Sequence, residues 1–526
     1  SGDVRMIGGA VGMDFNSVQI GHGGNYQVQG NIDGRIRVTG NHIDVVAGST
    51  AQSFARIGHG GGTLGVNNGN RSGSIFVRAT GELSVVQTSQ SAQIGHNTAG
   101  DGSLLNADAT IQADSLDATY GDAPGNGFEI NNAFAANMAA NLAGGDVSLH
   151  ATGAGGMLVN PTVNMTFTSA NGFNLLSEYG LAIRGTVQNQ GSGNINAIAG
   201  WNPVAAPLAN PLTDIIAGVD VASDLIGVAN AYGNHNAVVT VGSSTAAAAV
   251  GSVGGATTVL GHGVEVLGSS TNAGAHALIG TLPVAGLTRT GAITVMANAG
   301  GVTVRGGGVD NTFAQIGHRS LTGTTSPISS GIRVESLAGL ALRGGAGLLS
   351  SAQIGHGGGS GGAGAMGGAI DLNLATDIEL ASGGGAQAYT QIGHGGYGAG
   401  GATSGGITVL SRNASGVYGN IVLKGGGLDA YAQIGHGGSH NLASHGVAGD
   451  FINVDGATVT VEGGSGTRAY AQIGMGGATS IAGAEGALHG DVNINQNGGG
   501  SGVVTVKGGT GTEAYAQIGI GGTAWD

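Results

Sequence analysis

Short segments in which apolar and polar residues alternate recur along most of this chain. A first segment, such as residues 36–38 or 332–334, is followed by a second, such as residues 43–45. Turns that contain Gly, Asn or Ser separate the segments. Alternation with a period of two, β-branched residues and frequent turn residues are typical of β-strands. The pattern therefore predicts an all-β protein.

A third segment carries the clearest repeat, and residues 431–438 read Tyr-Ala-Gln-Ile-Gly-His-Gly-Gly. Consecutive copies are spaced by 37 and 37 residues, then 222, then 38, 38, 42, 39 and 45, and 222 is six times 37. A fixed period of this size indicates one structural unit that is stacked many times. The isoleucines of the copies are Ile20, Ile57, Ile94, Ile316, Ile354, Ile392, Ile434, Ile473 and Ile518.

Three strands and three corners in each repeat would form one rung of a parallel β-helix, with neighbouring rungs about 4.8 Å apart. We therefore predict a right-handed parallel β-solenoid, since parallel crossovers are nearly always right-handed. Each 37–45-residue repeat would form one three-stranded rung, and the remaining residues a loop after the motif, as at residues 358–368. Two shorter coils per repeat are the alternative, but they need more strands than the sequence offers.

The chain divides into three parts of one continuous solenoid. Regular rungs are expected over residues 1–96 and 278–526, and degenerate rungs with expanded loops over residues 97–277. Five of the seven prolines lie in this middle part, together with two Ala-rich stretches, 131–142 and 212–231, that suggest short helices. A separate middle domain is the less favoured interpretation.

Composition narrows the possible functions. The chain has 526 residues, 112 of them Gly, no Cys, only 9% charged residues and a net charge of −14. The shortage of basic residues argues against nucleic-acid binding. The lack of Cys rules out a disulfide framework or a Cys-ligated metal. No run of 18 apolar residues occurs, so we expect no membrane-spanning helix. Because the chain starts at Ser1 without a signal peptide, we expect a processed or excised piece.

Substitutions among the copies predict which way the third segment faces. The His position becomes Met475 and Ile520, and the Gln position becomes Arg56. Apolar replacements indicate a position that points inward, and an Arg replacement indicates one that points outward. We therefore expect Ala, Ile and His to face the core, and Tyr and Gln to face solvent.

The inward histidines invite a metal hypothesis, because imidazole is a good ligand for zinc, copper or nickel. Metal ligands must converge on one ion, however, and a single file of one His per rung does not converge. We expect a structural ladder instead, with stacked rings whose N–H groups bond to corner carbonyls, and no metal and no cofactor. The predicted ladder comprises His22, His59, His96, His318, His356, His394 and His436.

The outward Tyr and Gln positions form two neighbouring columns on consecutive rungs. Exposed aromatic strips usually mark interaction sites. We predict a flat contact face for a sugar polymer or for another solenoid; the alternative is a solvated face on which the rings stack. The predicted face comprises Tyr389, Gln391, Tyr431, Gln433, Tyr470, Gln472, Tyr515 and Gln517.

Enzymatic activity has little support in the sequence. The carboxylates are scattered, and Glu335 with Arg333 is a single pair on one strand face. Glycoside cleavage needs clustered carboxylates, and phosphate loops need a Gly-Lys-Ser/Thr sequence that does not occur here. We therefore expect no catalytic residue and no enzyme. A carbohydrate-binding or carbohydrate-cleaving β-helix is the alternative.

Gly-Asp-Val segments at residues 2–4 and 145–147, the segment 449–462, Gly-Gly corners and long degenerate repeats carry a resemblance. They resemble the secreted β-helical exoproteins of the filamentous haemagglutinin type, which are bacterial surface β-solenoids. The resemblance implies adhesion or surface structure outside a bacterial cell, and it transfers no catalytic residue. The amino-terminal secretion domain of that family is not recognisable here.

The two ends of the chain suggest self-association. Residues 2–6 read like the first strand of a rung and residues 515–520 like a third strand, without capping segments. Uncapped solenoid ends that match can stack head to tail into an open filament. We therefore expect an extracellular structural or adhesive protein that assembles end to end. Its partners would be other copies of itself, also side by side, and surface glycans.

Overall fold

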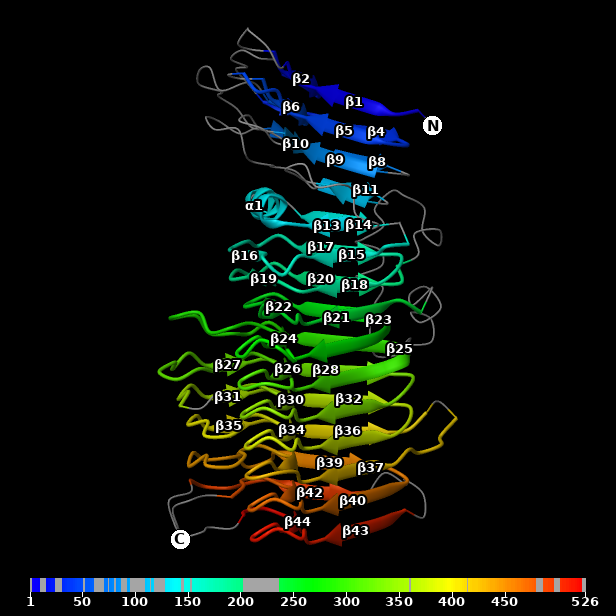
Figure 1. The fold of residues 1–526 in the computed structure, drawn as a ribbon. Coiled ribbons are helices and arrows are strands. Elements are labelled where there is room, and N and C mark those ends of the chain that lie inside the picture. Colours follow the sequence, from blue (N-terminus) through cyan, green and yellow to red (C-terminus); the bar gives the residue numbers. More distant parts are fainter. Residues whose placement is uncertain are drawn as a thin grey trace.

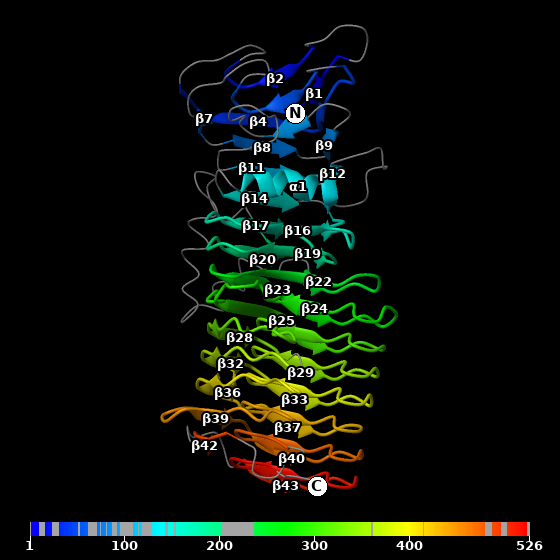
Figure 2. The same cartoon turned by 90° about the vertical axis from the view of Figure 1, so that its left-hand side faces the viewer.

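A computed structural model of the chain describes residues 2–9, 16–23, 31–50, 53–60, 71–73, 75–79, 82–86, 92–94, 109–113, 115–117, 128–142, 146–151, 154–201, 236–358, 361–413, 415–478, 486–495 and 502–522. Within these ranges nearly all regular structure is β-strand. The strands lie across one elongated body and stack from one end of it to the other (Figures 1 and 2).

Three columns of parallel strands form the body, and every pairing between strands of neighbouring rungs is parallel. The first column contains β4 (Ile36–Gly40), β8 (Ile75–Ala79), β11 (Ala109–Ala113), β14 (Val147–Ala151), β17 (Phe173–Ser177), β20 (Ile195–Ala199), the first parts of β23 (Thr257–Leu267) and β25 (Ile293–Arg305), β28 (Ile332–Ser336), β32 (Ile370–Leu374), β36 (Ile407–Ser411), β39 (Phe451–Asp455) and β42 (Asp491–Ile494).

The second column continues along β23 and β25, which are long enough to take part in both. Its other members are β1 (Val4–Ile7), β5 (Ile43–Val46), β9 (Glu82–Val86), β12 (Ser115–Asp117), β13 (Phe128–Ile130), β15 (Met157–Val159), β18 (Leu181–Ile183), β21 (Val238–Val241), β29 (Leu340–Arg343), β33 (Ile378–Ala381), β37 (Ile421–Lys424), β40 (Thr458–Glu462) and β43 (Val503–Lys507).

The third column contains the strands of the repeated motif and, in the middle part of the chain, strands of other sequence. It contains β2 (Val18–Ile20), β6 (Ala55–Ile57), β10 (Ala92–Ile94), β16 (Asn164–Phe167), β19 (Thr186–Asn189), β22 (Ala248–Ser252), β24 (Ala277–Ile279), β26 (Ala314–Ile316), β30 (Ala352–Ile354), β34 (Thr390–Ile392), β38 (Ala432–Ile434), β41 (Ala471–Ile473) and β44 (Ala516–Ile518). Outside it, short strands β3 (Ile32–Asp33) and β7 (Arg71–Ser72) pair, as do β27 (Ile328–Ser329), β31 (Met366–Gly367) and β35 (Thr403–Ser404).

Each repeat forms one rung, which confirms the predicted parallel β-solenoid. Ile332 of β28 pairs with Ile370 of β32, and Ile354 of β30 pairs with Ile392 of β34, one repeat further along in each case. The two-coil alternative is therefore wrong for these repeats. The right-handed sense stays a prediction.

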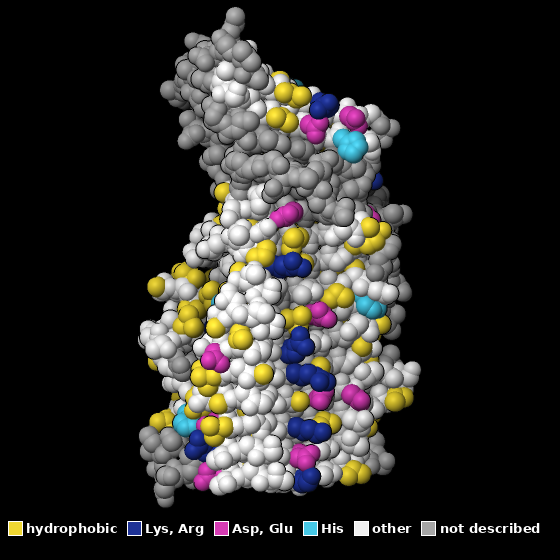
Figure 3. Space-filling view, in the orientation of Figure 1, with side chains coloured by type: hydrophobic (Ala, Val, Ile, Leu, Met, Phe, Trp, Pro, Cys, Tyr) yellow, Lys and Arg dark blue, Asp and Glu magenta, His cyan; other side chains and the backbone are white. Residues whose placement is uncertain are grey.

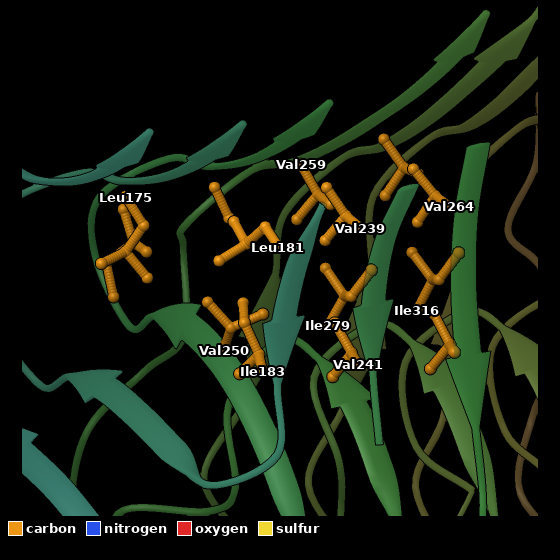
Figure 4. Close-up of a cluster of buried hydrophobic side chains, with 14 of the residues drawn as sticks. Leu175, Leu181, Ile183, Val239, Val241, Val250, Val259, Val264, Ile279 and Ile316 are labelled. Atoms are coloured by element: carbon orange, nitrogen blue, oxygen red, sulfur yellow. The ribbon is translucent and has the colours of Figure 1, made fainter. Parts of the chain in front are cut away.

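Alternate residues of all three columns fill the space between them. In β32 the pattern runs buried, exposed, buried, exposed, buried, as period-two alternation requires. Side chains such as Leu175 of the first column, Val239 of the second and Val250 of the third converge into one interior (Figure 4). A fully buried Val, Leu or Ile contributes about 1.5–3 kcal/mol through removal of its surface from water, so each rung adds its own share to the core.

The middle part is the irregular section that the sequence predicts. Helix α1 (Asn132–Asn141) forms in the first Ala-rich stretch, contacts β16 and precedes β14, where a regular rung has its third strand. The second stretch, 212–231, lies outside the described residues. Although 222 is six times 37, the rungs here are not evenly spaced, because Met165, Val187 and Val250 occupy successive core positions of the third column. Rungs with minimal loops need only about 22 residues, so loop length sets the period.

The predicted role of the first segment is wrong. Strand β1 pairs with β5 in the second column, whereas residues 2–6 were expected to begin a first column. The described part of the chain therefore begins one strand into a rung. Among the described residues, no helix is long and apolar enough to cross a membrane.

Candidate functional site

The third column is where the repeated motif places its polar side chains, and glycine makes its geometry possible. Gly435 has φ +150°, and a Cβ there would lie 1.9 Å from the carbonyl oxygen of Gly474 on the next rung. Gly437 follows at φ +108°. Only glycine allows the backbones to approach this closely in this conformation. The bend places His436 between the two glycines and turns its side chain inward.

The histidines of successive rungs stack as predicted. Ring centroids of His356 and His394 are 4.7 Å apart with an interplanar angle of 2°, and those of His394 and His436 are 4.7 Å apart at 3°. His318 stacks on His356 at 5.2 Å, and His22 on His59 at 4.9 Å.

Both ring nitrogens of His59, His318, His356, His394 and His436 are hydrogen-bonded. The backbone N–H of His356 donates to Nδ1 of His394 at 3.0 Å, and that of His394 donates to Nδ1 of His436 at 3.0 Å. Nε2 of His394 donates to the carbonyl of Gly368 at 2.9 Å, at the corner before β32. Because a backbone N–H can only donate and a carbonyl can only accept, these partners fix the neutral tautomer with the proton on Nε2.

Burial keeps four of the ladder histidines neutral. Desolvation lowers the pKa of His318 and His436 to about 4 and that of His394 to about 3, and it holds the pKa of His356 well below the usual value. The lone pair on each Nδ1 is occupied by the backbone N–H of the neighbouring rung, so it is not offered to a metal ion. The geometry confirms the predicted ladder for the residues His59, His318, His356, His394 and His436.

Two members of the predicted ladder differ. His22 is exposed, because it lies in the first rung and no described strand covers its outer side. It still donates its backbone N–H to Nδ1 of His59 at 3.0 Å. His96 lies outside the described residues. At the other end, Met475 takes the ladder position and packs into the hydrophobic core.

The predicted Tyr–Gln contact face is not a surface. The side chains of Tyr389, Tyr431 and Tyr470 are at most 1% exposed, and their rings stack on one another at 4.8 to 4.9 Å. The expectation of solvent exposure is wrong because the loop after each motif folds back over the outer side of the third column. The hydroxyl of Tyr389 donates to the carbonyl of Gly358 in such a loop, at 3.3 Å. Only Tyr515 and Gln517, in the last described rung, are half-buried.

The glutamines bind the motif glycines of the next rung. Nε2 of Gln433 donates to the carbonyls of Gly474 at 3.0 Å and Gly476 at 2.7 Å. The same arrangement joins Gln391 to Gly435 at 2.9 Å. It satisfies carbonyls at the bend, where the sheet hydrogen bonds stop. The buried set Gln315, Gln353, Gln391, Gln433 and Gln472 is therefore a second ladder and not a contact surface.

An arginine completes the aromatic column where a tyrosine is missing, and the sequence analysis overlooked it. The column position is His276, Phe313, Ser351 and then Tyr389 on successive rungs. The guanidinium of Arg319 lies 3.6 Å from the ring centroid of Phe313, next to the serine. Arg319 occupies the position where most other copies have the Gly after His, and this substitution is the signal that could have revealed it.

Basic side chains form a file on the outer surface, at the end of the second-column strands (Figure 3). The register aligns Arg305, Arg343, Lys424 and Lys507, and Arg184 directly follows β18 in the same column. Arg343 pairs with Glu379 at 2.5 Å and Lys507 with Glu462 at 2.6 Å. Among the described residues, no carboxylate pairs with Arg184 or Arg305.

A groove of about 520 Å³ lies between these two unpaired arginines. It is open because Gly242, which has no side chain, occupies the position of the basic file on the rung after Arg184. Gly268 lies beside the groove on the following rung. Its walls carry hydroxyls and two apolar side chains, from Thr240, Ser243, Ser244, Thr245, Ser269, Ser270, Pro161 and Leu267.

The carboxylates of the described residues do not converge on a common point. Glu335 pairs with Arg333, and burial raises the pKa of Glu335 even though Arg333 opposes that shift. Among the described residues, no three His, Asp or Glu side chains are grouped so that they could hold a metal ion.

Comparisons with family models, curated proteins and solved structures identify no relative. No family model matches the chain, no curated protein matches it, and no solved structure matches it. The resemblance to haemagglutinin-type exoproteins therefore stays a prediction.

Proposed function

We propose that this protein is a structural or adhesive rod of a bacterial surface, located outside the cell and without catalytic activity. One observation carries the proposal. The polar side chains of the repeated motif are the ones that could bind a ligand or take part in catalysis. They are instead used in hydrogen bonds between rungs. His394 binds two rung backbones and Gln391 binds a third-column carbonyl of the next rung.

A repeat of this kind supports rigid length. Each added rung contributes its own ring stack, histidine bonds and glutamine bonds, so stability grows with the number of rungs. The outer surface is poor in charge, since charged residues are only 9% of the chain. Such a surface suits contact with other neutral polar surfaces, including glycans and neighbouring rods.

Electron microscopy and cell labelling test this proposal. We expect the purified chain to form straight rods of uniform width, and antibodies to label it on intact cells without permeabilisation. Cleavage of a polysaccharide by the purified protein would contradict the non-catalytic part. Labelling only after permeabilisation would contradict the surface location.

End-to-end assembly is part of the same proposal. In the last described rung, Val503 and Val506 are 62% and 48% exposed, and Gln517 reaches only Ile520 of its own rung. The first rung of a second copy would cover this face, with β1 on β43 and β2 on β44. The first column would be one strand short at that junction. Fibres that shorten on Val504→Lys would support stacking of copies, whereas dispersed rods at high concentration would contradict it.

Carbohydrate binding is the second candidate, and the groove between Arg184 and Arg305 favours it. Two unpaired guanidinium groups suit carboxylates, and the hydroxyls between them suit sugar hydroxyls. We expect an oligogalacturonate to bind about tenfold more weakly to the Arg184→Gln/Arg305→Gln double variant. Arg343→Gln, which removes a paired cation of the same file, is the control and should leave the affinity unchanged. Equal loss in the control, or equal affinity for a neutral galactan, would exclude this site.

A further inference from the structure

A second cavity lies within the third column, at the level where the aromatic ladder is interrupted. Its volume is about 260 Å³. It exists because Ser351 occupies a position that Phe313 and Tyr389 fill with rings on the rungs to either side. Those two positions are two rungs apart, or about 10 Å. The lining residues are Gly274, Asn311, Phe313, Arg319, Leu321, Thr322, Leu349, Ser351, Gly358 and Tyr389.

The cavity contains a buried cation that lacks an anionic partner. Arg319 is 8% exposed and donates from a terminal nitrogen to Oε1 of Gln315 at 3.3 Å. Its Nε is buried and has no hydrogen-bond partner. No carboxylate of the described residues pairs with this guanidinium.

A second buried arginine adds to the same positive charge. Arg289 is fully buried, and its guanidinium donates to the backbone carbonyls of Arg319 and Ser326. Burial lowers the pKa of Arg289 and of Arg319 to about 10, so both remain protonated at neutral pH. Two desolvated cations that no described carboxylate neutralises are costly, since a buried ion normally has a partner of opposite sign.

We propose that this cavity binds a small monocarboxylate with an apolar body. The carboxylate would accept hydrogen bonds from Arg319, a pairing that the planar guanidinium favours. The apolar body would lie against Leu321 and Leu349, which line the cavity. A dry cavity of about 150 Å³ already holds a benzene ring, so 260 Å³ is sufficient for a phenyl or short aliphatic group.

This site does not depend on the proposed structural role. The cavity would bind a ligand and is not needed for the stacking of rungs. The outer surface of the rod would be the same whether or not the cavity is occupied. If no ligand binds this cavity, the proposed structural function is therefore unaffected. If the structural function is contradicted, the proposal for this cavity is equally unaffected.

Calorimetric titration with benzoate tests the proposal. We expect benzoate to bind at one site per chain, and neutral benzamide to bind at least tenfold more weakly because it cannot pair with the buried cation. Arg319→Gln should remove the preference for benzoate, whereas Arg319→Lys, which keeps the charge, should retain part of it. Binding of neither compound, or equal binding of both, would overturn the proposal.

A second variant keeps the test decisive if Arg319→Gln does not fold. Ser351→Tyr combined with Arg319→Gly recreates the Tyr and Gly arrangement of the later rungs, as at Tyr431 and Gly395. We expect this double variant to fold with an unchanged or higher melting temperature and to bind no benzoate. Undiminished benzoate binding by the double variant would contradict the assignment to this cavity.

Discussion

Acidification from pH 7 to pH 4.5 is expected to lower the free energy of unfolding by on the order of 2 kcal/mol for each of the buried ladder histidines His318, His394 and His436. In the folded chain the pKa of His318 and His436 is about 4 and that of His394 about 3, against about 6.5 when unfolded. Between these values the unfolded state binds protons that the folded state does not. Stability is therefore complete above pH 6.5 and falls as the pH decreases towards 4.

The denaturation midpoint in guanidinium chloride, measured at several pH values, checks this expectation. His394→Leu is the matched variant. At pH 7 it should cost about 2–4 kcal/mol, because the N–H of His356 and the carbonyl of Gly368 lose their partners inside the protein. On acidification, this variant should lose less free energy of unfolding than the parent. The difference should be the contribution of one ladder histidine, on the order of 2 kcal/mol. A parent protein equally stable at pH 7 and pH 4.5 would contradict the ladder.

Replacement of the motif glycine by alanine is expected to have the largest effect of any single substitution. In Gly435→Ala the new Cβ would lie 1.9 Å from the carbonyl oxygen of Gly474, and φ +150° is a strained conformation for alanine. Backbone atoms of two rungs would have to separate, so we expect a loss of more than about 4 kcal/mol.

Gly323→Ala provides the control for this substitution. Gly323 has φ +77°, and nothing lies within 4 Å of an added Cβ. It should therefore cost only the conformational strain of about 1–2 kcal/mol. Thermal unfolding of both variants measures the difference. Similar losses at the two positions would show that the close approach of neighbouring rungs is not what requires glycine.

The sequence predicted the fold because its period has a direct physical meaning. One motif per repeat gives one third-column strand per rung, and residues such as Ile354 and Ile392 pair in that register. The histidine ladder was also predictable, since Met475 at the same position indicates an inward side chain. The sequence pattern did not reveal the backbone N–H that occupies each Nδ1, because that donor belongs to another rung.

The prediction that Tyr and Gln of the motif face solvent was wrong, for a reason that applies to any prediction from period-two alternation. Alternation indicates which side of a strand a residue occupies, and Tyr431 does occupy the side opposite Ile434. It does not indicate what covers that side. Here the Gly-rich loop after each motif packs against the tyrosine hydroxyl, and Gly438 is close enough that a Cβ would lie 2.4 Å from it. The role of Arg319 was hidden in the same way, because it extends towards the space left by Ser351 on the following rung and lines the cavity there.

Histidine ¹⁵N NMR of the selectively labelled protein tests the central claim most directly. If the repeated motif serves only the interior, the rings of His318, His356, His394 and His436 should carry their proton on Nε2 and accept a hydrogen bond at Nδ1. Their shifts should not change between pH 8 and pH 6 or on addition of Zn²⁺, because their pKa lies far below this range. Ladder histidines that titrate near pH 6.5, or whose Nδ1 shifts on binding zinc, would contradict the account.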